Sequence, residues 1–392
     1  MPNHTQDRDL ADRLVSIRKR RGLSQPELAK AARLAASTVS KIERGELANP
    51  RLATIRALAG ALGTTTTVLQ GGIGDTEQAD AATNDVWAPV RHALAAPPAA
   101  EDDEPPTPAN IRAELSRLQV ELAAHRYQAI AADLPALLRD SATAGDRSLH
   151  AHTLGAVGWL LTQNRQWEDA ALVLDRAIET ADDEATAAAA VATRVWSELR
   201  QGHLDPARAL ALEWADRIEP KFSRASLAQL AVWGRLWLFI ATIAIRDNRQ
   251  HEYEDAIGLA RAAASRIGHE VITEVGSTRQ FGPITVEHVA AEAAVLNDQP
   301  AVALAIAAQT PRPTLLPTAA GRLRHRLDKA NAHSQLGDWD NAMGELRSLA
   351  NQAPEWIVQQ RYSRDIMGSI VERRRTLTDD MRELADMVRL EL

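Results

Sequence analysis

A short phrase that recurs along most of the chain restricts its fold more than any other sequence feature. In each copy a bulky residue, two spacers and a small or apolar residue open a helix, and successive copies lie 37 to 49 residues apart. The copies begin at Tyr127, Trp167, Leu204, Tyr253, Pro300 and Trp339. A helix pair of this kind leaves an apolar stripe uncovered, so neighbouring pairs must stack on one another. We therefore expect an all-α chain in which residues 109–392 form a solenoid.

The best copies resemble the tetratricopeptide repeat. One carries Gly158, Trp167, Ala170, Leu174 and Ala177, and another carries Ala330, Gly337, Trp339, Ala342 and Pro354. The period exceeds the repeat's usual length of about 34 residues, which implies lengthened helices and loops. The resemblance also implies that the first helix of each pair lines a concave ligand groove. It places on that groove His152, Trp159, Gln163, Trp196, Arg200, Asn248, Arg249, His288, Glu292, Arg324 and Asn331.

Two stretches interrupt the repeat. Residues 278–286, with Phe281, Gly282 and Pro283, predict a turn-rich insertion before a helix, and similar text occurs in actinobacterial repressor-type proteins with tetratricopeptide-like bodies. Residues 357–375 and 379–390 predict two amphipathic helices without a further pair to stack on. These terminal helices either cap the solenoid or form a dimer surface.

The first part of the chain carries a different signal, two short helices joined by a tight turn. Ser24, Pro26 and Glu27 form a capping box with a proline in the first turn, so a helix begins at Gln25. Its apolar face consists of Leu28, Ala29 and Ala32. Ser37 opens the second helix, whose Val39 and Ile42 lie three apart and predict its buried side.

Residues 13–69 resemble the phage-repressor family, the lambdoid repressor and Cro type that is also called the xenobiotic response element family. The matching positions are Arg13, Arg18, Ser24, Gln25, Glu27, Leu28, Ala29, Ile42, Glu43, Arg44, Gly45, Pro50 and Arg51. The resemblance implies that Gln25 binds a phosphate and that Arg44 and Arg51 lie near the DNA backbone or minor groove. It implies that Ala36, Ser37, Thr38, Ser40 and Lys41 face the base edges.

Arg33 is a departure from this family, which usually has a glycine at that turn. A left-handed conformation at a non-glycine residue costs about 1 kcal/mol. Either Arg33 accepts this strain, or the turn has another shape. The Arg33 cation either contacts a phosphate or is solvated. The family also implies that Arg18 pairs with Glu43 inside the module, which makes both residues structural.

Charge is distributed unevenly along the chain. The net charge is −7, yet residues 1–72 hold twelve Lys and Arg against six Asp and Glu, which gives +6 and leaves −13 for the remaining residues. A basic module on an acidic body attracts phosphate locally and keeps the body away from the duplex. This pattern predicts that double-stranded DNA is the partner of residues 1–72.

The segment between the two regions differs from both in composition. Residues 73–108 are rich in proline and contain eight acids against Arg91 alone, which predicts a solvated linker or a competitor of DNA for the basic module. Val86, Trp87, Val90 and Leu94 are spaced as on a short amphipathic helix, and Trp87 is expected to dock on a neighbouring domain or a partner subunit.

Composition argues against other classes of protein. The chain has no cysteine, which excludes disulfides and thiolate zinc sites and suits a reducing cytoplasm. The start lacks a signal-peptide pattern, and the apolar run 236–245 is short for a membrane span, so it predicts a buried helix. The pairs His150/His152 and His325/His333 lack metal-ligand spacing, and the sequence predicts no metal, no cofactor and no enzymatic activity.

Together these features predict a cytoplasmic, nucleoid-associated transcription regulator that is a homodimer. The layout is similar to that of peptide-pheromone receptors of quorum sensing, which implies a short peptide effector, with a small metabolite as the second choice. Two half-sites about 34–36 Å apart would match a two-fold dimer. The alternative is a tetratricopeptide scaffold for protein partners, in which the DNA-binding module only localises the complex.

Overall fold

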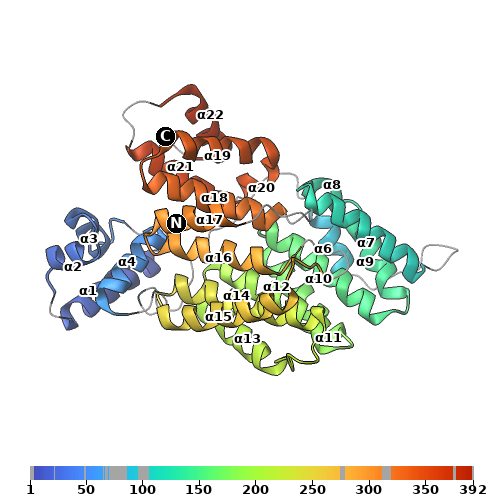
Figure 1. Ribbon diagram of the computed structural model, residues 1–392. Coiled ribbons are helices and arrows are strands. Elements are labelled where there is room, and N and C mark those ends of the chain that lie inside the picture. Colours follow the sequence, from blue (N-terminus) through green and yellow to red (C-terminus); the bar gives the residue numbers. More distant parts are fainter. Residues whose placement is uncertain are drawn as a thin grey trace.

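The computed structural model describes residues 4–21, 23–47, 50–64, 66, 69, 86–95, 106–273, 279–310, 319–373 and 377–390. Within these ranges the regular elements are helices, apart from one isolated antiparallel bridge between Val271 and Phe281. Figure 1 shows a small amino-terminal module at one end of a larger stack of helix pairs. The all-α prediction is confirmed.

Four helices make up most of the amino-terminal module: α1 (His4–Arg20), α2 (Gln25–Ala31), α3 (Ala36–Glu43) and α4 (Leu52–Leu62). Their apolar faces meet in one core that includes Leu14, Leu28, Val39, Ile42 and Leu58, each at most 1% exposed. Thr66 and Leu69, which follow α4, are helical and buried.

Paired antiparallel helices build the body. The pairs are α7 (Pro108–Ala123) with α8 (Tyr127–Ala131) and α9 (Leu134–Thr143), α10 (Arg147–Gln163) with α11 (Trp167–Thr180), α12 (Glu184–Gln201) with α13 (Leu204–Arg217), α14 (Leu227–Arg246) with α15 (Gln250–Ile267), α16 (Pro283–Leu296) with α17 (Pro300–Gln309), and α18 (Ala319–Gln335) with α19 (Trp339–Gln352). Five of the six predicted anchors are the first residue of a second helix. Tyr253 is the exception, because its helix begins three residues earlier at Gln250.

The turns inside these pairs share one backbone feature. A residue with positive φ stands two positions before each second helix: His125, Arg165, Gly202, Asn248, Asp298 and Gly337, with φ from 59° to 82°. Four of the six are not glycine, at a cost of about 1 kcal/mol each. The left-handed residue reverses the chain within a few positions, which brings the two helices of a pair together.

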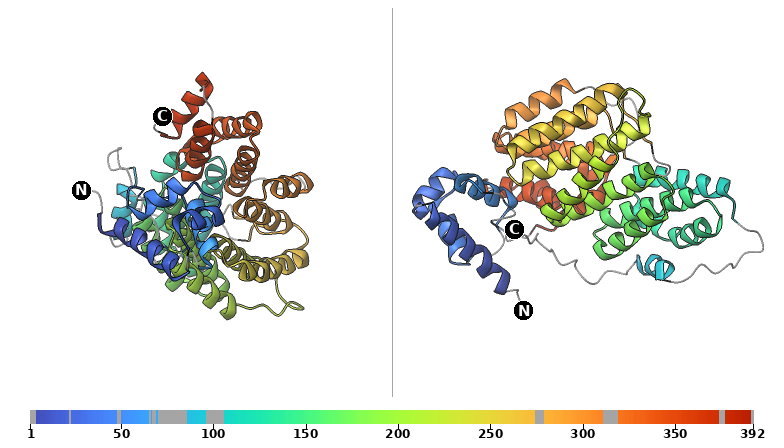
Figure 2. Two further views of the ribbon diagram at one scale, coloured as in Figure 1. Left: turned by 90° about the vertical axis from the view of Figure 1, so that its left-hand side faces the viewer. Right: turned by 90° about the horizontal axis from the view of Figure 1, so that it is seen from below.

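The stack closes on itself, which the sequence analysis did not predict. Helix α20 (Pro354–Val358) lies near α8 (Figure 1), and the Tyr127 backbone N–H donates to Glu355 Oε2 at 3.0 Å. Figure 2 shows the same stack from two further sides. Further along, Arg200 donates to the Gln359 carbonyl oxygen at 3.4 Å. One apolar core holds residues of the first pairs together with Leu327 and Ile366 from the end of the chain. The predicted open groove is therefore an enclosed interior.

Helix α6 (Ala88–Ala95) belongs to the body. Trp87 is 6% exposed and packs in the same apolar core as α7 and α9, while Arg176 donates to the Leu94 carbonyl at 2.5 Å. The neighbouring domain is therefore the surface on which Trp87 docks. Residues 73–85 and 96–105 of the predicted linker lie outside the described residues.

Helix α14 lies at the centre of the body. It is long and apolar enough to cross a membrane by length and composition, but 78% of its apolar window is buried inside the protein, as in a core helix. The predicted burial of residues 236–245 is confirmed, within a longer helix. Phe281, from the insertion before α16, is fully buried against α14 at Gly234, where there is no room for a Cβ atom.

The carboxyl-terminal helices cover the last pair. The predicted helix 357–375 is divided, because α20 ends at Val358 and α21 (Arg361–Arg373) begins after a turn, and α22 (Asp379–Met387) follows. Ile366, Met367, Ile370 and Leu384 are at most 3% exposed and lie in the body's core. Their burial supports the cap interpretation of these helices.

Candidate functional site

Local sequence chemistry positions the two short helices of the amino-terminal module. The predicted capping box is present: the Glu27 backbone N–H donates to Ser24 Oγ at 3.4 Å, and the Ser24 backbone N–H donates to Glu27 Oε2 at 2.8 Å. Helix α2 therefore begins at Gln25 as predicted. Helix α3 begins at Ala36 after Ala35, which has no side-chain cap, so the prediction that Ser37 opens this helix was wrong by one residue.

A buried ion pair holds α3 against the first two helices. Arg18 donates to both carboxylate oxygens of Glu43, at 2.5 and 2.7 Å, and Gln25 Nε2 donates to the same carboxylate at 2.8 Å. Burial alone would raise the pKa of Glu43, but the bonds from Arg18 and Gln25 outweigh it and the net pKa is lowered. The pairing of Arg18 with Glu43 is as expected, whereas the side chain expected to bind phosphate, Gln25, is bound to Glu43.

The outer side of α3 is polar and open. Val39 and Ile42 are at most 1% exposed and face the core. Ala36, Ser37 and Lys41 are exposed, and Thr38 and Ser40 are half-buried. Such a helix, fixed by its apolar side and presenting small polar groups and a cation, has the dimensions and chemistry to enter a major groove.

Comparison with protein families agrees with this geometry. The family model described as helix-turn-helix matches residues 5–69. Residues 5–69 form a helix-turn-helix domain. It is of the Cro/C1 type, and the match supports a DNA-binding transcription regulator. Comparison with curated proteins and with solved structures found no match.

Two cations at the edge of the helix-turn-helix domain contact the body. Arg33 has a φ of 55°, so it accepts the left-handed strain, and its exposed guanidinium lies 3.3 Å from Asp298. Arg51 donates to Ser369 Oγ and to Glu372 Oε1, both at 3.0 Å, from the turn before α4 to α21. Arg44 instead pairs with Glu46 at 3.0 Å within the domain. DNA phosphates would therefore compete with acids of the body for Arg33 and Arg51.

Arg56 and Thr66, which the sequence analysis did not single out, join the domain to the body. The guanidinium of Arg56 donates to the carbonyls of Ile245 and Leu296, at the carboxyl ends of α14 and α16. Thr66 Oγ1 donates to Asp247 Oδ1 at 2.6 Å, beside the same end of α14. Helix ends have unpaired carbonyls and a partial negative charge, so a cation there is well placed.

Part of the predicted ligand groove converges in the enclosed interior. Glu292 Oε1 on α16 accepts from Arg246 and from Arg324, the latter at 2.9 Å, and Asn331 donates to Tyr362 Oη at 2.9 Å. His288 stacks on His325 with ring centroids 4.1 Å apart. Arg200 donates to the Thr162 carbonyl at 3.0 Å. Arg246 and Tyr362 were missed, because they belong to a helix end and to a terminal helix that no repeat pattern places inside.

The remaining groove residues have other surroundings. Trp159 and Gln163 are 7% and 5% exposed, and Trp159 packs edge-on against Tyr127, so both belong to the core. Trp196 stacks on Phe239 with centroids 5.9 Å apart. His152 contacts its own helix at the Ser148 carbonyl, 2.8 Å away.

The placement of Asn248 and Arg249 on the groove was wrong, because they lie on the turn after α14. The amide of Asn248 faces Gly60 of the helix-turn-helix domain, 3.5 Å from where a Cβ would lie. Arg249 pairs with Asp247 at 2.6 Å. Both residues thus belong to the side of the body on which the domain docks.

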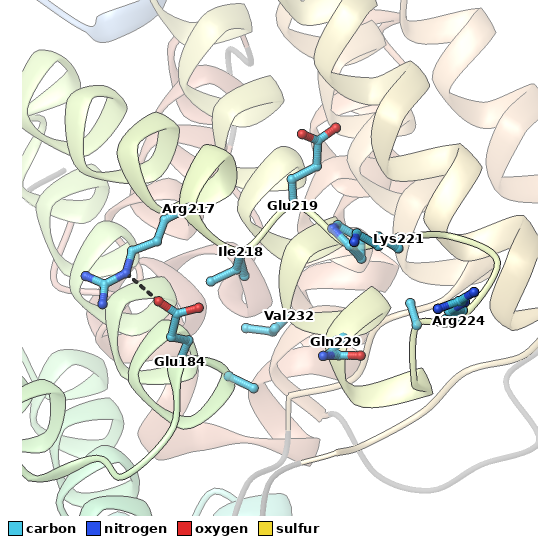
Figure 3. Close-up of a pocket in the computed structure, with 11 residues that line it drawn as sticks. Glu184, Arg217, Ile218, Glu219, Lys221, Arg224, Gln229 and Val232 are labelled. Carbon is cyan, nitrogen blue, oxygen red and sulfur yellow. Dashed lines mark hydrogen bonds and ion pairs between the residues drawn. The ribbon is translucent and has the colours of Figure 1, made fainter.

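A separate pocket of about 350 Å³ opens at the turn between α13 and α14 (Figure 3). Its rim has exposed charges: Arg217, paired with Glu184 at 2.9 Å, and Lys221 and Arg224. Ile218 and Val232 line it as well. None of its residues belongs to the predicted groove. Among the described residues there is no group of three or more side chains suited to hold a metal ion.

Proposed function

We propose that this regulator reads an operator with α3 and senses a signal with its tetratricopeptide-like body. The outer face of α3 is the observation that carries the proposal: Ser37 and Lys41 are exposed on a helix that Val39 and Ile42 fix in place. Base edges are read by Lys41 and the neighbouring small polar residues, while Arg44 and Arg51 contact phosphates. Phosphate contacts orient the domain, and base contacts select the sequence.

The active form is a homodimer on a nearly palindromic operator. Two helix-turn-helix domains bound one turn apart, about 34–36 Å, would read two half-sites. A short peptide is the first candidate for the effector and a small metabolite the second. An effector acts here by binding one shape of the body better than another, since only differential affinity shifts the population of the two.

The test compares Lys41→Ala with Arg51→Ala on the DNA upstream of the protein's own gene and on a scrambled duplex, at two salt concentrations. Loss of a base contact costs about 1–3 kcal/mol, so Lys41→Ala is expected to weaken operator binding by roughly 10- to 100-fold and to spare the scrambled duplex. Arg51→Ala is expected to weaken both alike and to lower the salt slope by about one.

Arg147→Ala is the matched control. Arg147 is an exposed arginine on α10 that pairs with Asp182 at 2.8 Å, far along the chain from the helix-turn-helix domain. Equal losses on both duplexes for Lys41→Ala would contradict base reading by α3. If wild-type protein bound both duplexes alike and released both at higher salt, the domain would be an electrostatic tether, and the body would be a scaffold for protein partners.

A further inference from the structure

Three arginines converge in the enclosed interior of the body. This interior arginine cluster consists of Arg200, Arg246 and Arg324, which lie on α12, α14 and α18, the first helices of three pairs. Burial and then the charges of Arg165 and Arg324 lower the pKa of Arg200 to about 9. Burial lowers the pKa of Arg246, which also interacts with Glu292 and Arg324. The members therefore lie close enough to repel one another.

Two buried acids, Glu292 and Asp328, lie among these cations. Glu292 accepts hydrogen bonds from Arg246 and Arg324 through the same oxygen. Asp328 is 1% exposed and its Oδ1 lies 3.9 Å from Arg324 Nε, and burial together with the charge of Glu292 raises its pKa well above the usual range. Two carboxyl groups, one of them with a raised pKa, thus face three guanidinium groups, and a buried excess of like charge is unfavourable.

The cluster also has donors that the described residues do not satisfy. Arg246 Nη1 and Arg324 Nε are buried and have no hydrogen-bond acceptor within the described part of the chain. A buried donor without an acceptor is unfavourable and calls for an ion or water in most proteins. The Arg324 side chain is 27% exposed, so solvent reaches the cluster. Planar guanidinium groups with spare N–H donors match the oxygens of carboxylate and phosphate.

We propose that the interior arginine cluster binds a small anion through carboxylate or phosphate oxygens, and that this anion is the signal sensed by the body. This site gives the proposed function a chemical class of effector, and its role as a signal rests on that proposed function. The anion supplies oxygen acceptors to Arg246 and Arg324 and adds negative charge beside the three guanidinium groups.

The position of Arg246 connects this site to the helix-turn-helix domain. Arg246 is the last residue of α14, and its carbonyl accepts a hydrogen bond from Thr66 at 3.2 Å. The preceding residue, Ile245, accepts from Arg56, which also bonds to the end of α16, four residues beyond Glu292. An anion that draws Arg246 away from Glu292 therefore acts on the two helix ends that hold the domain.

The first test measures anion binding by the full chain. Inorganic phosphate and citrate are titrated at constant ionic strength, with sodium chloride as the reference, and binding is followed by thermal unfolding and calorimetry. Wild type is expected to bind one of the probes at millimolar concentration or below, and the probe that binds identifies the oxyanion. Arg324→Met is expected to weaken binding at least tenfold, and Arg147→Met, an exposed arginine outside the cluster, leaves it unchanged.

Glu292→Gln provides a second test that does not depend on how Arg324→Met folds. It removes the acid that competes for both arginines and keeps its shape, so anion affinity is expected to rise about tenfold. Absence of any response to both probes in wild type and Glu292→Gln overturns the proposal, and so does an equal response in Arg324→Met.

DNA titrations with and without the probe separate the two proposals. A change of at least threefold in operator affinity that disappears in Arg324→Met supports the anion as signal. Specific operator binding that the probe leaves unchanged overturns the signal while the proposed function stands. Anion binding without any preference for the operator leaves the site in place and contradicts the proposed function.

Discussion

Removal of the Arg56 guanidinium is expected to loosen the helix-turn-helix domain from the body. Arg56 is 7% exposed, and its guanidinium donates to the Ile245 and Leu296 carbonyls. It also donates to Asn297 Oδ1 at 3.3 Å. These acceptors are more than 180 residues away along the chain. Arg56→Met keeps the length and apolar stem of the side chain and removes its donors and charge.

The magnitude follows from two opposing contributions. Burial and the charge of Arg246 lower the pKa of Arg56 from 12.5 to about 10, which corresponds to about 3 kcal/mol against the charged side chain. Two hydrogen bonds from a charged donor contribute about 1.5–3 kcal/mol each. The attraction between the cation and the partial negative charges of two helix ends adds a few tenths of a kcal/mol or more. The net is about 2 kcal/mol in favour of docking, so Arg56→Met should raise the undocked fraction about 30-fold.

Distances between spin labels provide the assay. The chain has no cysteine, so Lys30→Cys on α2 and Val302→Cys on α17, both exposed, give a unique labelled pair across the two units. The distance distribution should be narrow in the otherwise wild-type chain and broad in Arg56→Met. Arg21→Met is the control, because Arg21 bonds to the Gly63 carbonyl at 3.1 Å within the domain itself. An unchanged distribution in Arg56→Met would refute the reasoning.

Three further predictions concern stability. Glu43→Gln strands Arg18 in a buried site and should destabilise the helix-turn-helix domain by about 3 kcal/mol, measured by hydrogen exchange of α3 amides; a loss below about 1 kcal/mol would contradict a structural role. Gly234→Ala should lower the free energy of unfolding by about 1–3 kcal/mol through overlap with Phe281, whereas Gly258→Ala, in open space on α15, should raise it by about 0.5–1 kcal/mol in the same denaturant titration. Acid should destabilise the body. Burial and the charge of Lys329 lower the pKa of His325 to about 4, so between pH 6.5 and 4 only the unfolded chain takes up this proton. This uptake lowers the free energy of unfolding by about 2 kcal/mol at pH 5, and the pH dependence should be flatter in His325→Gln.

Local features of the fold could be predicted from the sequence because they depend on residues close together in the chain. The capping box at Ser24 and Glu27 places the start of α2 by itself. A phrase of four residues predicts where α11, α13 and α19 begin, at Trp167, Leu204 and Trp339. Tyr253 shows the limit of such a phrase, since an aromatic residue three positions inside a helix fits it almost as well.

The candidate sites were predicted only where a family pattern or a repeat places them. Lys41 and its neighbours lie on an open helix face because a single helix has one face that Val39 and Ile42 do not occupy. Glu292 and Arg324 lie inside the body because both are on first helices. Nothing local in the sequence distinguishes Arg56 from other arginines on exposed helix faces.

The sequence by itself determined the helices, their pairing into repeats, and a basic DNA-binding domain ahead of an acidic body, since propensity, capping and periodicity act within a few residues. Only the tertiary structure decided that the stack closes, that Arg246 and Tyr362 face the interior, and that Arg56 joins two helix ends. These contacts depend on the summed curvature of many pairs. A small rotation at each pair is not encoded in any one of them, so its total appears only when the whole chain has packed.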